Sequence, residues 1–259
     1  MNKSFPTTGT FKKNFKIHIW GDPLTYSLSI FFQEHVASLN GYRLIYSPFR
    51  GSGHSFKKIL SKKNCAGANI TMPFKVEALS MCDQLTEAAL CSGSVNTIFK
   101  SSGKLVGDNT DGEGLFKWME MRSKLDSVIQ IIGNGGSARA IAYTFFKNKI
   151  KVIICGRKFK GWEENFGKFV SLEKYSPDIP TVNTLPFPIR GKNILDISYE
   201  QGDVPESAKG MLACQGALSF EKWMDKKIPF ETYIKLTSLH AKAHSNTFLL
   251  SYLAGRHKE

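Results

Sequence analysis

Short apolar runs alternate with amphipathic segments along most of the 259-residue chain. An apolar run between turn residues predicts a buried strand, and apolar positions three or four residues apart predict a helix. Strands are predicted at residues 15–20, 42–49, 66–71, 127–133, 151–156, 178–183 and 192–198. Helices are predicted at residues 29–40, 55–63, 73–85, 112–124, 137–149, 211–224 and 230–244. Residues 95–109 predict a hairpin that turns at Ser101, Ser102 and Gly103.

This alternation of strands and helices predicts parallel α/β sheets. After the hairpin, the pattern restarts near residue 112 with a helix and a new buried strand. We therefore expect a two-lobed α/β fold with a cleft between the lobes. The expected divisions are residues 1–111 for the first lobe and 112–209 for the second, with the C-terminal helices of 210–259 returning to the first.

A glycine-rich turn, IIGNGGSARA, follows the strand predicted at 127–133. Gly133, Gly135 and Ala138 match the pattern G-x-G-x-x-G/A. In that pattern the first glycine permits a tight turn, the second lets a pyrophosphate approach the backbone, and the third small residue lets helix and strand pack closely. The start of the next helix also offers free N–H groups to phosphate. The turn predicts a Rossmann dinucleotide site at Gly133, Asn134, Gly135, Gly136, Ser137 and Ala138.

The end of the next strand indicates which dinucleotide is bound. NAD sites place an acidic residue there for the ribose 2′-hydroxyl, whereas this chain has Gly156 followed by the basic segment RKFK. Arg157 can bind a 2′-phosphate in bidentate fashion and stack on the adenine, with Lys158 beside it. The segment therefore favours NADP over NAD, and the alternative is an ordinary basic loop.

Composition narrows the class of protein. The net charge of +13 comes from 35 basic and 22 acidic residues, yet the basic residues form no long run and no nucleic-acid-binding signature is present. Five cysteines without a C-x-x-C pair predict free thiols in a reducing compartment. The polar N-terminus lacks a signal-peptide pattern, and no apolar run is long enough for a membrane span. We expect a cytoplasmic monomer or homodimer that binds a small anionic molecule.

Six polar motifs occur in the chain. GDPLTYSLS, ANITMPFK, GSVNTI and GDNTDGEGL lie in the first lobe, and DIPTVNTLPF and GMLACQGALSF lie downstream. In this order and spacing they resemble the shikimate dehydrogenase family over about residues 15–225. The family patterns N-[VI]-T-x-P-x-K and N-T-D-G are matched in full, whereas Tyr26 and Ile30 stand where the first motif has His and Pro.

The resemblance implies NADP-linked interconversion of 3-dehydroshikimate and shikimate, with substrate in the first lobe and NADP in the second. It places the catalytic pair at Lys75 and Asp111. The chemistry of ketone reduction supports this assignment, because a ketone that receives hydride needs a proton donor or cation beside its oxygen. The implied substrate ligands are Ser27, Ser29, Thr71, Asn96, Tyr199 and Gln215, beside Asp111 itself, and Thr184 joins the cofactor residues.

Several of these residues also have structural interpretations. Ser27 and Ser29 could cap the helix that begins nearby, and Asp111 could be the N-cap of helix 112–124. His240 and His244 are spaced like metal ligands but lack a third partner, so no metal site is predicted. Two other functions stay open: a related enzyme acting on quinate, and a non-catalytic ligand or nucleic-acid binder on the same fold.

Overall fold

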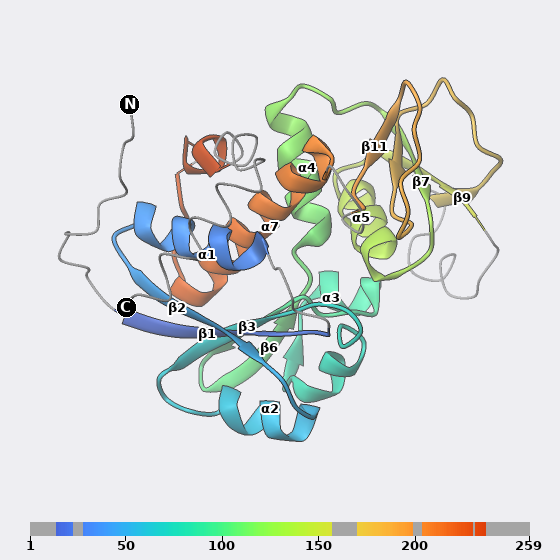
Figure 1. Cartoon of the computed structure of the whole chain (residues 1–259). Coiled ribbons are helices and arrows are strands. Elements are labelled where there is room, and N and C mark those ends of the chain that lie inside the picture. The colour runs from blue at the N-terminus through green and yellow to red at the C-terminus, as the bar shows by residue number, and fades with distance from the viewer. Residues whose placement is uncertain (1–13, 23–27, 157–169, 199–203, 230, 237–259) are drawn as a thin grey trace.

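The computed structural model describes residues 14–22, 28–156, 170–198, 204–229 and 231–236. Figure 1 shows two β-sheets, one in each lobe, with two long helices between them. The apolar runs of the sequence form these sheets, and the predicted α/β class with parallel strand pairs is confirmed. Ser27, Arg157, Lys158, Tyr199, His240 and His244 lie outside the described residues.

The first lobe contains a six-stranded sheet in the order β2-β1-β3-β5-β6-β4. Its strands are β1 (Asn14–Trp20), β2 (Arg43–Phe49), β3 (Cys65–Ile70), β4 (Gln84–Leu85), β5 (Thr97–Ser101) and β6 (Lys104–Asp108). The first three are parallel, and β5 and β6 form the predicted antiparallel hairpin. The helices of this lobe are α1 (Leu28–Leu39), α2 (Gly53–Leu60) and α3 (Glu87–Ser92).

The second lobe contains a parallel five-stranded sheet in the order β11-β10-β7-β8-β9. Its strands are β7 (Val128–Ile132), β8 (Lys151–Cys155), β9 (Val170–Leu172), β10 (Thr181–Asn183) and β11 (Ile194–Asp196), and helix α5 (Gly136–Lys147) follows β7. The strand order reverses between β7 and β10. In open α/β sheets ligands bind at such a switch point, outside the carboxyl ends of the strands.

Helices α4 (Asp111–Met121) and α7 (Glu206–Met224) lie between the sheets and pack against each other (Figure 1). Glycines allow the close approach: a Cβ on Gly114 would lie 2.7 Å from the backbone nitrogen of Gln215, and one on Gly210 would overlap the Trp118 ring. On the other side of α4, a Cβ on Gly112 would overlap the carbonyl oxygen of Ala140 in α5. Helix α4 is therefore in tight contact with both lobes.

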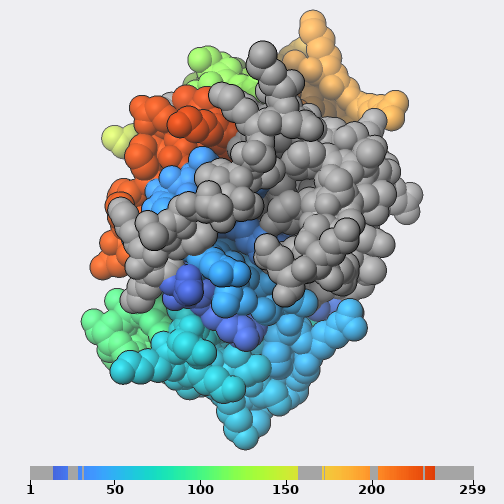
Figure 2. Space-filling view, turned by 60° about the vertical axis from the view of Figure 1, so that its left-hand side comes forward, coloured from blue at the N-terminus to red at the C-terminus, as the bar shows by residue number. Residues whose placement is uncertain are grey.

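Helix α7 brings the chain back to the first lobe. Figure 2 shows the orange-red C-terminal residues directly against the blue residues near the start of the chain. Helix α7 contacts α1, and Trp223 Nε1 donates to the carbonyl oxygen of Ile98 in β5 at 3.0 Å. No helix in the described ranges combines the length and apolar character that a bilayer span requires.

One predicted helix is wrong. Residues 73–85 form a turn, a short 3-10 helix at Glu77–Met81 and the edge strand β4. The apolar residues here have helical spacing, but hydrogen bonds between Asp83 and the hairpin prevent a helix. The Asp83 N–H donates to the Leu105 carbonyl at 2.8 Å, and the Asp83 carboxylate accepts from the Leu105 N–H at 2.8 Å. Pro73 lies in a turn, after a cis peptide bond, and not in the first turn of an α-helix.

Candidate active site

Lys75 and Asp111 are in direct contact. Lys75 lies in the turn that follows β3, and Asp111 is the first residue of α4, directly after the polar segment that leaves β6. The Lys75 carbonyl accepts from the Val95 N–H at 2.8 Å, which holds the turn against the segment before β5. Lys75 Nζ lies 2.7 Å from Asp111 Oδ2, with 21% of the lysine side chain and 7% of the aspartate side chain exposed. The ammonium is thus the more accessible member of the pair.

The Asp111 carboxylate accepts three side-chain hydrogen bonds. Asn96 Nδ2 donates to Oδ1 at 2.6 Å, while Lys75 Nζ and Ser137 Oγ donate to Oδ2 at 2.7 and 3.2 Å. The start of α4 adds a favourable dipole. Thr110, and not Asp111, is the N-cap of this helix, so the capping interpretation of Asp111 is wrong. A carboxylate with this many donors is suited to holding a cation in a fixed position.

Asn96 and Gln215 extend this site into the protein. Asn96 Nδ2 lies 3.4 Å from Gln215 Oε1, and Thr110 Oγ1 donates to Gln215 Oε1 at 3.2 Å. The Thr110 N–H donates to Asn96 Oδ1 at 2.9 Å, which fixes the orientation of that amide. Two predicted substrate residues from distant segments, Asn96 and Gln215, are therefore brought together with the predicted catalytic pair.

Behind these residues lies a buried polar network that the sequence-based site did not include. Asn69 Oδ1 accepts from Tyr46 Oη at 2.8 Å and from Gln33 Nε2 at 3.3 Å, and Asn69 Nδ2 lies 3.3 Å from Ser219 Oγ. Ser219 Oγ is 2.7 Å from Thr97 Oγ1. Asn69, Thr97 and Ser219 all belong to the polar motifs of the sequence, and this membership is the feature that could have assigned them to the site. Tyr46 and Gln33 lie outside these motifs, and no sequence feature indicates their place in the network.

Thr71 directly follows β3, whereas Ser29 lies in α1, the helix that comes after β1 in the chain. Trp20 pairs with Ile70, so Thr71 directly follows the paired residues of β1 and β3. Both Ser29 and Thr71 are half-buried, and Ser29 lies within the first turn of α1 rather than at its cap. The Thr71 N–H donates to the Trp20 carbonyl at 2.9 Å, so Thr71 is held beside the end of β1.

The glycine-rich turn leaves open space beside its backbone. Gly133 has φ +119°, and a Cβ there would overlap Thr184 Oγ1, which donates to the Ile132 carbonyl at 2.8 Å. Among the residues that the structure describes, none beyond its chain neighbours would lie within 4 Å of a Cβ on Gly135, so these residues leave the space beside it open. Gly135 is the N-cap of α5 and no side chain caps that end. The turn therefore leaves room and N–H donors for a phosphate.

The remaining members of the turn have different environments. Ala138 is fully buried, as close packing of helix and strand requires. Gly136 lies against Ser94, since a Cβ there would be 2.9 Å from the Ser94 Cβ. Asn134 is half-buried and Ser137 is directed toward Asp111. Thr184, which follows β10, faces Gly133 across the switch point of the sheet.

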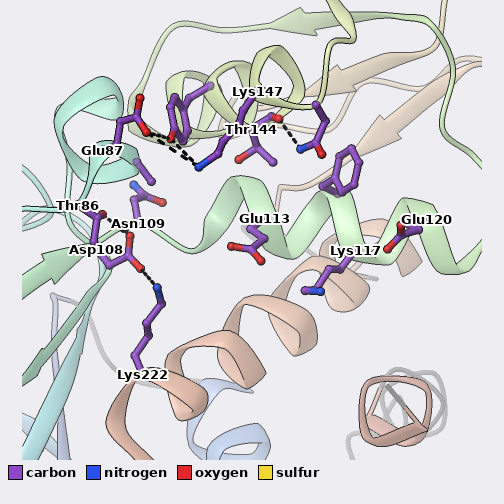
Figure 3. A pocket seen from close by; sticks show the side chains of 14 residues that line it. Thr86, Glu87, Asp108, Asn109, Glu113, Lys117, Glu120, Thr144, Lys147 and Lys222 are labelled. Atoms are coloured by element: carbon purple, nitrogen blue, oxygen red, sulfur yellow. Dashed lines mark hydrogen bonds and ion pairs between the residues drawn. The ribbon is translucent and has the colours of Figure 1, made fainter. Parts of the chain in front are cut away.

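A separate pocket of about 470 Å³ lies along α4, between α3, α5 and α7 (Figure 3). Lys222 pairs with Asp108 at 2.9 Å on one side, and Tyr143 Oη donates to Glu87 Oε2 at 2.8 Å on the other. Lys75, Asp111, Asn96 and Gln215 do not line it. This pocket is therefore distinct from the candidate active site, although the Tyr143–Glu87 bond also joins the two lobes.

Comparison with known proteins identifies the family. The model of the shikimate dehydrogenase substrate-binding domain matches residues 19–98. The shikimate dehydrogenase (NADP(+)) of Staphylococcus aureus strain Newman is 30% identical over 252 residues, which cover 82% of this chain and 93% of that protein.

Solved structures show the same fold. The shikimate 5-dehydrogenase of Thermus thermophilus, in complex with NADP(H) and shikimate, has a TM-score of 0.69 and 22% identity over 87% of this chain and 99% of its own. A chorismate mutase/shikimate 5-dehydrogenase fusion protein from Clostridium acetobutylicum has a TM-score of 0.73 and 23% identity over 90% and 99%. The chain described here belongs to the shikimate dehydrogenase family.

Proposed function

We propose that this protein catalyses the reversible NADPH-dependent reduction of 3-dehydroshikimate to shikimate. The observation that carries the proposal is the contact between Lys75 and Asp111 beside the phosphate-binding turn, with Ser137 of that turn bonded to the same carboxylate. Residues 1–111 would bind the substrate and 112–209 the cofactor, with 210–259 returning to the substrate side. An intact catalytic pair supports an enzyme over a non-catalytic binder.

In the proposed reaction, NADPH supplies a hydride to the carbonyl carbon. The carbonyl oxygen then gains a proton, and Lys75 Nζ is the group that would donate it. Asp111 orients the ammonium through the 2.7 Å contact and balances its charge in a partly buried site. The lysine, after giving up its proton, is reprotonated from solvent, which its 21% side-chain exposure permits. In the reverse direction Lys75 removes the hydroxyl proton while the carbon gives its hydride to NADP⁺.

The substrate ring would lie between Lys75 and the amides of Asn96 and Gln215. Amide and hydroxyl groups suit a polyol because they both donate and accept hydrogen bonds. Thr71, which follows β3, and Ser29, in the first turn of α1, would contact the carboxylate end, together with Ser27 and Tyr199. The network behind Asn96 would keep this polar surface in one arrangement.

The cofactor would bind across the switch point of the second sheet. Gly135 leaves the space that a pyrophosphate needs, and the uncapped start of α5 offers N–H donors. Thr184 would face the nicotinamide side of the turn. The 2′-phosphate would be bound by Arg157 and Lys158, which makes NADP the preferred dinucleotide.

Oxidation of shikimate followed at 340 nm tests the proposal, with NADP⁺ and NAD⁺ compared in parallel. Replacing Lys75 by Ala should lower kcat by about 10³-fold or more, since it removes both the proton donor and the cation. Shikimate binding, measured by calorimetry, should change by less than about tenfold. Lys100→Ala, a surface lysine that donates to the Lys62 carbonyl at 2.8 Å, is a control for loss of positive charge.

Three results would contradict this proposal. A K75A variant that turns over shikimate normally would remove Lys75 from the chemistry. A higher kcat/KM with quinate than with shikimate would assign the protein to the quinate reaction. Absence of any NADP⁺-dependent absorbance change with either substrate would show that the fold is used for binding alone.

A further inference from the structure

Ser137 connects the two lobes at the catalytic pair. It is the second residue of α5, directly after the glycines of the phosphate-binding turn. Its Oγ donates to Asp111 Oδ2 at 3.2 Å, the same oxygen that accepts from Lys75 Nζ. The pattern of the turn predicted Ser137 as a cofactor residue, but its hydroxyl is directed at the carboxylate of the other lobe.

The donors to Asp111 come from three separate elements. Lys75 is carried by the turn after β3 and Asn96 by the segment before β5, both in the first lobe. Ser137 adds a donor from the second lobe. Because a carboxylate that is held by donors on both oxygens has little freedom to rotate, the position of Asp111 depends on how α5 sits against α4.

Close packing fixes that relation. A Cβ on Gly112, the residue after Asp111, would overlap the Ala140 carbonyl, and it would also overlap Thr144 Oγ1. Gly136, the residue before Ser137, lies against Ser94. Asn109 Nδ2 in turn donates to Ser94 Oγ at 2.8 Å, and Asn109 Oδ1 accepts the Asp111 N–H at 3.1 Å. Backbone and side chains on both sides of the Ser137–Asp111 bond are therefore in contact.

We propose that Ser137 is a positioning residue that couples the phosphate-binding helix to the catalytic lysine through Asp111. Its hydroxyl fixes the carboxylate that orients Lys75 Nζ, and it does so only while α5 is seated against α4. Cofactor that binds at the start of α5 would stabilise this seating. The inference rests on the proposed function for the role of Lys75, but the bond itself is independent of any ligand.

Kinetics separate this role from a phosphate contact. Ser137→Ala should lower kcat about 10- to 100-fold, the effect of losing one hydrogen bond to a charged group, with KM and Kd for NADP⁺ within about twofold of wild type. Ser137→Thr keeps the hydroxyl and should restore most of kcat. Tyr143→Phe removes a different interlobe hydrogen bond, to Glu87, and should leave kcat unchanged.

A second readout needs neither cofactor nor turnover. Lys75 is labelled with trinitrobenzenesulfonate, and the rate is followed by mass spectrometry of its peptide. The S137A protein should label at Lys75 several times faster than wild type, because a lysine side chain that Asp111 holds less firmly reaches the reagent more often. The Y143F protein should label at the wild-type rate. Urea unfolding of all variants shows whether a general loss of stability accounts for any change.

Two outcomes would overturn the proposal. If S137A raises the Kd for NADP⁺ and leaves kcat unchanged, Ser137 is a phosphate ligand. If S137A leaves both kcat and the Lys75 labelling rate at wild-type values, the bond has no positioning effect. Should the wild-type protein fail to oxidise shikimate, the proposed function fails, and the labelling comparison still decides the role of Ser137.

Discussion

Alanine substitutions at Gly133 and Gly135 should affect different properties, although both glycines belong to the same turn. The first should lower stability, and the second should weaken NADPH binding. Gly133 has φ +119°, where an alanine is strained, and its Cβ would overlap Thr184 Oγ1. The substitution would also disturb the 2.8 Å bond from Thr184 Oγ1 to the Ile132 carbonyl. Backbone strain of about 1–3 kcal/mol and one lost hydrogen bond of about 1 kcal/mol predict that G133A lowers the free energy of unfolding by about 2–4 kcal/mol.

Gly135 has φ −75°, which any residue can adopt, and in the described part of the chain a Cβ there would meet no atom within 4 Å beyond its neighbours in sequence. G135A should therefore change the free energy of unfolding by no more than about 0.5 kcal/mol. The added methyl group would occupy the space that a pyrophosphate needs. Loss of one or two charge-assisted hydrogen bonds predicts a Kd for NADPH that is about 10- to 100-fold higher.

Urea unfolding and NADPH fluorescence titration measure the two quantities separately. Thr184→Ala provides the matched control, because in that background G133A should cost only the backbone strain, about 1–3 kcal/mol. The reasoning is refuted if G135A is destabilised as much as G133A. It is also refuted if G135A binds NADPH with wild-type affinity.

Two further substitutions test the interior of the first lobe. Asn69→Ala removes the acceptor of the buried Tyr46 hydroxyl. The loss in free energy of unfolding should therefore be about 1–3 kcal/mol smaller in a Tyr46→Phe background than in wild type. Equal losses in the two backgrounds, measured by urea unfolding, would contradict this. The pKa of His18 is lowered from 6.5, first by burial and then by Lys16, so the unfolded chain binds a proton there more readily than the folded one. Stability from this residue therefore falls as the pH drops below about 6.5, and His18→Gln should lose less stability than wild type between about pH 7.5 and 5.5. Parallel pH profiles of the two proteins in thermal melts would show that His18 does not contribute.

The parts of the fold that follow from local pattern were predictable. Strand β1 alternates apolar and polar residues, β7 and β8 are mostly apolar, and the turn after β7 carries its own glycine pattern. The strand and the 3-10 helix within residues 73–85 could not be predicted from local pattern. They depend on Asp83 and its bonds to Leu105 in the distant hairpin. Helix α3 and strands β4 and β9 are six, two and three residues long, too short for a periodic signal.

The candidate site shows the same division. Lys75, Asp111, Asn96 and Gln215 are named by motifs, and the structure brings them together. The direction of the Ser137 side chain depends on the packing of α5 against α4, which no local pattern encodes. The contact of Tyr46 with Asn69 likewise depends on how β2 and β3 flank β1 in the sheet.

The return of α7 to the first lobe has a consequence for the order of folding during synthesis. Gln33 donates to the Gly216 carbonyl at 3.0 Å, and Asn69 and Ile98 bond to Ser219 and Trp223. These partners are separated by 183, 150 and 125 residues. While the ribosome is still making the second lobe, the first lobe therefore lacks one wall of its interior. The first lobe, although it is translated first, can reach its final packing only after the second lobe has emerged.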